Sequence, residues 1–151
     1  MEIAIGADHE GYMLRRQVIE QLQRAGHHVL DMGTDSAESV DYPDYARAVA
    51  EAVAGGDAER GILICGSGAG VSVAANKCRG VRAATVHDVF TAHQCVEHDN
   101  VNVLCMGSHV VGKWLAADIV RAWVEARFSG DERHRRRLEQ VEQMESESQP
   151  D

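Results

Sequence analysis

The segment from Gly61 to Gly70 combines an apolar run, a cysteine and a glycine-rich turn. Its four apolar residues end at Cys65 and are bounded by glycines, which is typical of a strand buried on both faces of a parallel sheet. The residues that follow have the pattern of a short helix, whose free N–H groups would point back at the turn. This order predicts that Cys65 lies at the carboxyl edge of a sheet, where open α/β folds bind their ligands.

Cys65 is the cysteine best suited to chemistry. A thiol beside a helix N-terminus is activated towards the thiolate form, which suits a base or a nucleophile, although a cysteine in an apolar strand is often inert packing. We assign the other three cysteines to packing: Cys78, Cys95 and Cys105. The spacing of the four cysteines is not that of a zinc site, and we expect reduced thiols without a disulfide framework.

The turn that follows Cys65 contains Gly66, Gly68 and Gly70. Glycines let backbone N–H groups converge on a ligand, so the turn is a candidate cradle for a phosphate or an oxyanion; the alternative is an ordinary tight turn between strand and helix. No Gly-Lys-Ser/Thr follows, and the glycine spacing is not that of a dinucleotide fold. A cysteine phosphatase would need an arginine at the position of Val71.

Two polar pairs are candidates for acid–base chemistry. Asp8 and His9 follow the first expected strand, and His98 and Asp99 end the fourth expected helix. We expect both pairs to lie near the carboxyl edge of the sheet. Three other histidines are interpreted as solvated or hydrogen-bonded residues: His27, His28 and His134. Because the eight histidines show no metal-ligand spacing, we expect no metal site.

A basic cluster runs from Arg133 to Arg137 in a chain of net charge −9. On a helix these two arginines share a face one turn apart and could clamp a phosphate, although such a run is often a solvated charged face. The acidic balance of the rest of the chain argues against binding to nucleic acid or to an acidic membrane surface.

The whole chain has 151 residues, of which 44% are hydrophobic, and these values are typical of one globular domain. We expect that domain to span residues 1–145, followed by a disordered acidic tail over 146–151. The residues after Met1 enter a strand pattern at once, without the pattern of a signal peptide, and no apolar run approaches the roughly 18 residues of a membrane span. The expected location is the cytoplasm.

Strand and helix patterns alternate along the sequence. The expected strands cover 2–6, 28–32, 62–65, 82–86 and 103–106, and each connection is long enough for a helical crossover. This alternation predicts an α/β fold, with a five-stranded parallel sheet covered by helices on both faces. An extra C-terminal helix begins at Asp131, after the break at Ser129-Gly130, and we expect it to pack on a second copy of the chain.

These motifs resemble the type B ribose-5-phosphate isomerases, a family grouped with the allose- and galactose-6-phosphate isomerases. The matching segments follow in order along nearly the whole chain: Ile3–His9, Asp41–Pro43, Gly61–Gly70, Ala74–Lys77, Glu97–His98, Asn102–Leu104, Arg133 and Arg137. The resemblance implies a Rossmann-like three-layer α/β/α sandwich. It also implies a homodimer, sometimes paired into a tetramer, with active sites shared between subunits and with no metal or organic cofactor.

The resemblance also assigns roles by position. Cys65 is similar to the base that moves a proton between C2 and C1 of an open-chain sugar phosphate. A second branch of the family uses a glutamate at the position of Val71, so this chain resembles the cysteine branch. Ser67 and the backbone N–H groups of the turn, including that of Ala69, would stabilise the enediolate oxygen.

Other residues resemble those that open the sugar ring and hold the substrate. His98 matches the residue that protonates the ring oxygen, with Asp8 assisting at the sugar hydroxyls. The phosphate clamp corresponds to His9, Arg133 and Arg137.

Two residues depart from the pattern of the family. Asp99 stands where an asparagine is usual, and His109 stands where an arginine of the phosphate site is expected. Both changes remove positive charge from the expected anion site or add negative charge to it. The resemblance implies an aldose–ketose isomerase of ribose 5-phosphate and ribulose 5-phosphate, and the two departures bear on the substrate more than on the type of reaction. The alternatives are the same chemistry on a four- or six-carbon sugar phosphate, and a sugar-phosphate-binding module without catalysis.

Overall fold

The computed structural model describes residues 1–151, in which five strands and five helices alternate along the chain before a sixth, final helix. The strands are β1 (Glu2–Ala7), β2 (His28–Asp31), β3 (Arg60–Cys65), β4 (Ala83–Thr85) and β5 (Val103–Gly107). The helices are α1 (Tyr12–Arg24), α2 (Tyr42–Gly55), α3 (Ala69–Ala75), α4 (Val89–Asp99), α5 (Lys113–Glu125) and α6 (Glu132–Ser148).

All five strands are parallel and form one sheet in the order β2-β1-β3-β5-β4. The chain adds β2 on one side of β1 and β3 on the other, so the direction of winding reverses between β1 and β3. Open α/β sheets bind ligands in the crevice outside such a reversal. At the carboxyl edge Ala7 is paired with Ile64, and Cys65 is paired with Gly107. The loops after β1, β3 and β5 therefore meet at one place.

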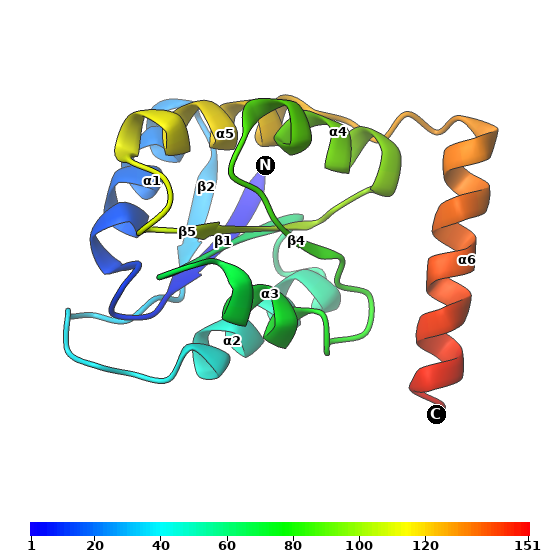
Figure 1. Ribbon diagram of the computed structural model, residues 1–151, viewed down its shortest axis with the longest axis horizontal. Helices are drawn as coiled ribbons and strands as arrows, with labels where there is room; N and C mark the ends of the chain where they lie inside the picture. Colours follow the sequence, from blue (N-terminus) through cyan, green and yellow to red (C-terminus); the bar gives the residue numbers. More distant parts are fainter.

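Helices cover both faces of the sheet, as Figure 1 shows. One core lies between the sheet and helices α1, α4 and α5, and the other lies between the sheet and helices α2 and α3. Alternation along β3 divides its residues between the two cores, with Ile62 and Ile64 in the first and Leu63 and Cys65 in the second. The predicted three-layer α/β/α sandwich with a parallel sheet is confirmed.

Local sequence signals place the helix ends. Gly26 has a left-handed φ of 88° just after α1, which ends that helix. Helix α2 begins after Asp41 with proline in its first turn, and the Asp88 carboxylate accepts a hydrogen bond of 2.7 Å from the Thr91 N–H to cap α4. That bond lowers the pKa of Asp88.

Helix α6 stands apart from the three layers, at the end of a connection that leads away from α5 (Figure 1). Its apolar side chains Val141 and Met144 are 51% and 68% exposed, so the chain itself leaves this face largely uncovered. The expectation of a disordered tail from residue 146 is wrong up to Ser148, because α6 continues to that residue. None of the six helices has the length and apolarity needed to cross a membrane.

Candidate active site

Cys65 is the last residue of β3, and its side chain faces the core beneath α2 and α3. The residue is 5% exposed, and its Sγ accepts a hydrogen bond of 3.2 Å from the Gly68 N–H. That donor is in place because Gly68 adopts a left-handed φ of 78°. A Cβ at Gly68 would also lie 2.9 Å from the Met106 carbonyl carbon, so this position requires glycine.

Neighbouring strands hold the turn in position. The Thr85 hydroxyl at the end of β4 donates a 2.8 Å hydrogen bond to the Gly68 carbonyl, and the Ser108 N–H donates a 2.8 Å bond to the Cys65 carbonyl. The Gly107 N–H donates to His87 Nε2 at 2.9 Å. The ends of β3, β4 and β5 are therefore linked around the thiol.

The remaining residues of the turn surround the thiol. The exposed Ser67 hydroxyl oxygen accepts a 3.2 Å bond from the Ala69 N–H, which leaves the hydroxyl proton free to donate. The Tyr42 ring lies against Gly70, where an added Cβ would be 2.7 Å from the ring carbon Cζ. The segment predicted as a cradle is thus a hydrogen-bonded turn, and the Tyr42 ring packs against one side of it.

The loop after β1 brings Asp8 to the same edge. Asp8 is 6% exposed, and its Oδ1 accepts hydrogen bonds from the N–H groups of Glu10 at 3.0 Å and Gly11 at 3.2 Å. The loop lies directly on β3, since a Cβ at Gly11 would be 2.3 Å from the Ile64 carbonyl oxygen. The main chain therefore fixes the Asp8 carboxylate next to the strand of Cys65.

Three side chains form the rim beside this loop. His9 Nδ1 accepts a 3.1 Å hydrogen bond from the Val40 N–H. Glu10 Oε2 lies 2.8 Å from His109 Nε2, and Glu10 Oε1 lies 3.6 Å from His9 Nε2. The His109 ring adjoins the turn, where a Cβ at Gly66 would be 3.1 Å from its Cδ2. His109 thus reaches the site from β5, and Glu10 connects it to the β1 loop.

His98 and Asp99 do not lie at this edge, and the prediction that they do is wrong. They end α4, which starts after β4 and runs back across the sheet. The Asn100 carbonyl accepts a 2.8 Å bond from Arg82 Nε, beside the start of β4. Strand β5, from Val103 to Gly107, separates this region from the edge of Cys65 by about 13 Å.

His98 is stacked on His134, with ring centroids 4.2 Å apart and an interplanar angle of 26°. His134 is 3% exposed; its Nδ1 is 2.5 Å from the Ser129 hydroxyl, and its Nε2 accepts a 3.4 Å bond from Arg133 Nε. His134 is hydrogen-bonded, which is one of the two interpretations from the sequence, but it is buried on α6 and does not lie in a solvated loop. Its spacing from Leu138 and Val141 on one helix face is the signal that could have revealed its burial.

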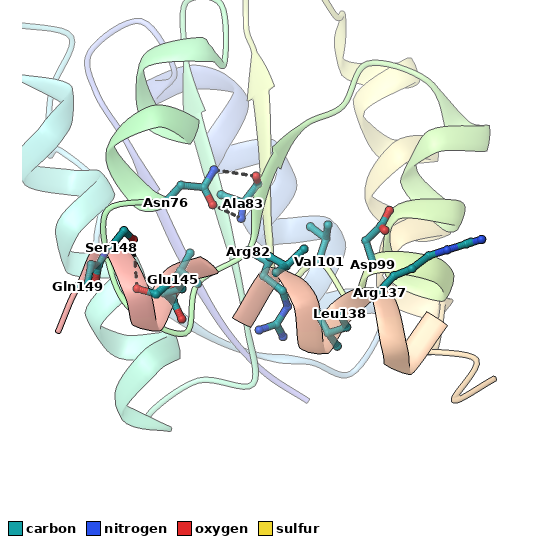
Figure 2. Close-up of a pocket in the computed structure, with 12 residues that line it drawn as sticks. Asn76, Arg82, Ala83, Asp99, Val101, Arg137, Leu138, Glu145, Ser148 and Gln149 are labelled. Atoms are coloured by element: carbon teal, nitrogen blue, oxygen red, sulfur yellow. Dashed lines mark hydrogen bonds between the residues drawn. The ribbon is translucent and has the colours of Figure 1, made fainter. Parts of the chain in front are cut away.

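The two arginines of the expected phosphate clamp lie on α6, near His98. Arg133 is 61% exposed, and its only ion pair, to Asp131, is 3.9 Å long. Arg137 lines a groove of about 420 Å³ together with Asp99, and Figure 2 shows the two side chains next to each other at one end of it. Arg133 thus has only this one long ion pair, and Arg137 has none.

The predicted site residues thus form two groups. One group gathers at the carboxyl edge of the sheet: Asp8, His9, Cys65, Gly66, Ser67, Gly68, Ala69, Gly70 and His109. The other lies beside the amino ends of β4 and β5: His98, Asp99, Arg133 and Arg137. No set of three or more His, Cys, Asp or Glu side chains is arranged to hold a metal ion.

The other cysteines lie in apolar or half-buried places. Burial raises the pKa of Cys95 to about 11, with a further contribution from the nearby Asp99 carboxylate. Burial also raises the pKa of Cys105, a fully buried residue of β5, and that of the half-buried Cys78. These thiols stay protonated at neutral pH, as packing residues do.

A family model for the ribose/galactose isomerases matches residues 3–141. This range covers both groups of site residues. The chain belongs to the ribose/galactose isomerase family. Both groups of predicted site residues thus lie within the part of the chain that matches a family of sugar isomerases.

Relatives within the ribose/galactose isomerase family act on sugars of different length. Ribose-5-phosphate isomerase B of Escherichia coli is 46% identical over 144 residues, covering 95% of this chain and 96% of that protein. D-erythrulose-4-phosphate isomerase of Pectobacterium atrosepticum is 40% identical over 131 residues, covering 86% of each chain. The structure of Clostridium thermocellum ribose-5-phosphate isomerase B has a TM-score of 0.96, at 46% identity, and covers 99% of this chain and 100% of that one.

Proposed function

We propose that this isomerase interconverts ribose 5-phosphate and ribulose 5-phosphate by proton transfer through a cis-enediolate. The observation that carries the proposal is the hydrogen bond from the Gly68 N–H to Cys65 Sγ at the carboxyl edge of the sheet. An N–H aimed at sulfur stabilises the thiolate, which is the form able to remove a proton. The 46% identical Escherichia coli relative supports the choice of a five-carbon substrate.

Cys65 is the base of the proposed reaction. In the aldose-to-ketose direction its thiolate removes the proton from C2, and electrons from the C–H bond form the C1–C2 double bond of the enediolate. The carbonyl electrons of C1 move onto O1, which then takes the proton of the O2 hydroxyl. The O2 electrons re-form a carbonyl at C2 while the C1–C2 double-bond electrons take the proton back from the thiol at C1, which gives the ketose and regenerates the thiolate. Every proton and electron pair is accounted for within the substrate and one side chain, so the chemistry needs no cofactor.

The turn stabilises the negative oxygen of the enediolate. The Ser67 hydroxyl proton is free to donate, since its oxygen already accepts from the Ala69 N–H. Backbone N–H groups of residues 66–70 supply further dipoles that are fixed before the reaction, and such preorganised donors are often the largest catalytic contribution. Asp8 holds a sugar hydroxyl with its second oxygen, because Oδ1 is occupied by two backbone N–H groups.

Ring opening and phosphate binding require a second copy of the chain. His98 protonates the ring oxygen, and Arg133 and Arg137 bind the phosphate together with His9, but three of these residues lie at the opposite edge from Cys65. A homodimer in which α4 and α6 of one subunit meet the Cys65 edge of its partner completes each site. The uncovered apolar face of α6, at Val141 and Met144, supports this arrangement.

The alternative substrate is a sugar phosphate of another length. The Pectobacterium atrosepticum relative is named for a four-carbon substrate, and the family name includes galactose. His109 in place of the expected arginine, with its Glu10 partner, is the feature that favours such a change. A binding module without catalysis is disfavoured, because binding alone does not need a cysteine whose sulfur has its own N–H donor.

Turnover on a panel of four-, five- and six-carbon aldose phosphates tests the proposal. We expect the highest kcat/KM with ribose 5-phosphate and entry of solvent deuterium into the product at the carbon that receives the proton. A higher kcat/KM with a four- or six-carbon substrate would select the alternative. Absence of both turnover and deuterium exchange across the panel would leave only the binding module.

The proposed place of action is the cytoplasm. All four cysteines are unpaired, and the proposed base must stay reduced to work. Reducing compartments keep thiols in that state.

A further inference from the structure

The Glu10 carboxylate lies between two imidazole rings on the rim of the site. Its Oε2 is 2.8 Å from His109 Nε2, and its Oε1 is 3.6 Å from His9 Nε2. The carboxylate therefore connects the loop after β1 to the residue that follows β5. A Cβ on Gly66 would be 3.8 Å from Glu10 Cβ, so the Glu10 side chain also adjoins the turn of Cys65.

Hydrogen bonding fixes which ring nitrogens carry protons. His9 Nδ1 accepts from the Val40 N–H, so His9 carries its proton on Nε2, the nitrogen that faces Glu10. His109 Nε2 is within hydrogen-bond distance of a carboxylate oxygen, which only accepts, so this nitrogen also carries a proton. Two N–H groups from separate loops thus converge on one anion.

We propose that Glu10 lowers the affinity of the site for phosphate, because it competes with the phosphate of the substrate for the N–H groups of His9 and His109. The inference rests on the proposed function, in which His9 contributes to the phosphate clamp. Two converging imidazole N–H groups suit a phosphate oxygen as well as a carboxylate oxygen. The carboxylate and the phosphate are both negative, so they cannot share these donors without repulsion.

The surrounding contacts let the side chain move while its main chain stays in place. The Glu10 N–H donates to Asp8 Oδ1 at 3.0 Å, and its carbonyl accepts a 2.8 Å bond from the Ser108 hydroxyl. The Glu10 side chain is 45% exposed, and its only side-chain partners are the two histidines. Rotation into solvent frees both N–H groups without disturbing Asp8. Glu10 thus weakens phosphate binding by the cost of this displacement.

The test is calorimetric binding of inorganic phosphate to the full-length protein and to its Glu10→Gln variant. The substitution keeps the size of the side chain and removes its charge. We expect phosphate to bind about three- to tenfold more tightly to the variant, because one negative charge is removed within a few ångströms of the anion. The matched control is Glu20→Gln on α1, which removes the same charge from an exposed residue that pairs with Arg24.

Two further measurements locate the effect. Adding His109→Ala to Glu10→Gln should reduce the gain in phosphate affinity, because one of the two freed donors is then missing. The KM for ribose 5-phosphate should fall in Glu10→Gln by a factor similar to the gain in phosphate affinity. Equal or weaker phosphate binding by Glu10→Gln, or no binding by either protein, would overturn the inference.

The outcome is separable from that of the proposed function, because phosphate binding is measured without turnover. If the wild-type protein isomerises the sugar phosphate and Glu10→Gln binds phosphate with unchanged affinity, only the proposed competition by Glu10 is contradicted. Tighter phosphate binding by Glu10→Gln, with no turnover of any sugar phosphate, contradicts the isomerase proposal and supports the competition.

Discussion

The two ends of the sheet hold their polar residues in different ways. At the carboxyl edge the backbone fixes the side chains, since Cys65 Sγ receives the Gly68 N–H and Asp8 Oδ1 receives two further N–H groups. At the amino edge the polar residues are carried on helices, where Arg133 is 61% exposed and Arg137 has no ion pair. Backbone hydrogen bonds hold the polar side chains at one end, and the other end presents arginines with few partners.

This difference matches what each half of the proposed reaction demands. Proton transfer requires a base within hydrogen-bond distance of the carbon acid, so errors of about 1 Å are costly. Attraction between a cation and a phosphate falls off slowly with distance and tolerates motion of the side chain. The side chains that need accurate placement are held by hydrogen bonds from the main chain. Those that need only to supply charge lie on exposed helix surfaces.

Replacement of the base should give the largest effect at the carboxyl edge. We expect Cys65→Ala to lower kcat by about 10²- to 10⁴-fold, the usual contribution of a positioned acid or base. Binding of a substrate analogue, measured by calorimetry, should change little because the phosphate contacts remain. Activity close to that of the wild type would show that another group transfers the proton.

Mixing two inactive variants tests whether the two ends meet across subunits. Cys65→Ala and His98→Ala should each be nearly inactive alone, since each lacks one group at every site. After joint unfolding and refolding in equal amounts, about a quarter of the wild-type activity should return, because half of the dimers are mixed and each mixed dimer has one intact site. If activity stays at background while mixed dimers are detected by mass spectrometry, the site is not shared.

The main-chain support of Cys65 is tested by Gly68→Ala. We expect the free energy of unfolding to fall by roughly 1–3 kcal/mol, because the substitution strains a left-handed residue and brings a Cβ to the Met106 carbonyl. Gly26→Ala is the matched control, with a φ of 88° and open space around its Cβ. Equal losses for the two variants in urea unfolding would mean that packing against Met106 adds nothing.

The smallest effect is expected for Cys95→Ala on α4. Unlike Cys65, whose sulfur accepts a hydrogen bond, the Cys95 thiol donates one to the Ala92 carbonyl. Its pKa is raised to about 11 in the folded chain. The contribution of the neutral thiol to stability is therefore complete below the unfolded pKa of about 8.5 and is lost as pH rises through the folded pKa. As the pH rises between these two values, the free energy of unfolding in urea should decline more steeply for the wild type than for Cys95→Ala. Equal declines for the two proteins would contradict the raised pKa of Cys95 in the folded chain.

The sequence predicted the layers and the carboxyl-edge group because both follow from local patterns. Alternating strands and helices define a parallel sheet, and residues directly after a strand, such as Asp8 and those following Cys65, lie at its carboxyl edge. His98 was misplaced because it ends a helix, and a helix that follows a parallel strand returns to the opposite edge. Topology alone would have corrected this error.

Other features could not be predicted from local patterns. Glu10 and His109 are separated by 99 positions in the chain, and their contact depends on how two loops pack after the sheet has formed. The stack of His98 on His134 depends on the path of the connection that precedes α6. In both cases the sequence supplies the residue types, and tertiary packing determines which of them meet.

His98 and Cys65 of one chain are separated by the length of β5. The proposed activity therefore depends on the concentration of the dimer. In the proposed dimer a single chain carries every group that the reaction needs but has no complete site, so a newly synthesised chain would be inactive until it binds a partner. At concentrations below the dimer dissociation constant, turnover per chain should fall in proportion to the population of dimers. The rate of sugar interconversion would then report how much of the protein is assembled as well as how much is present.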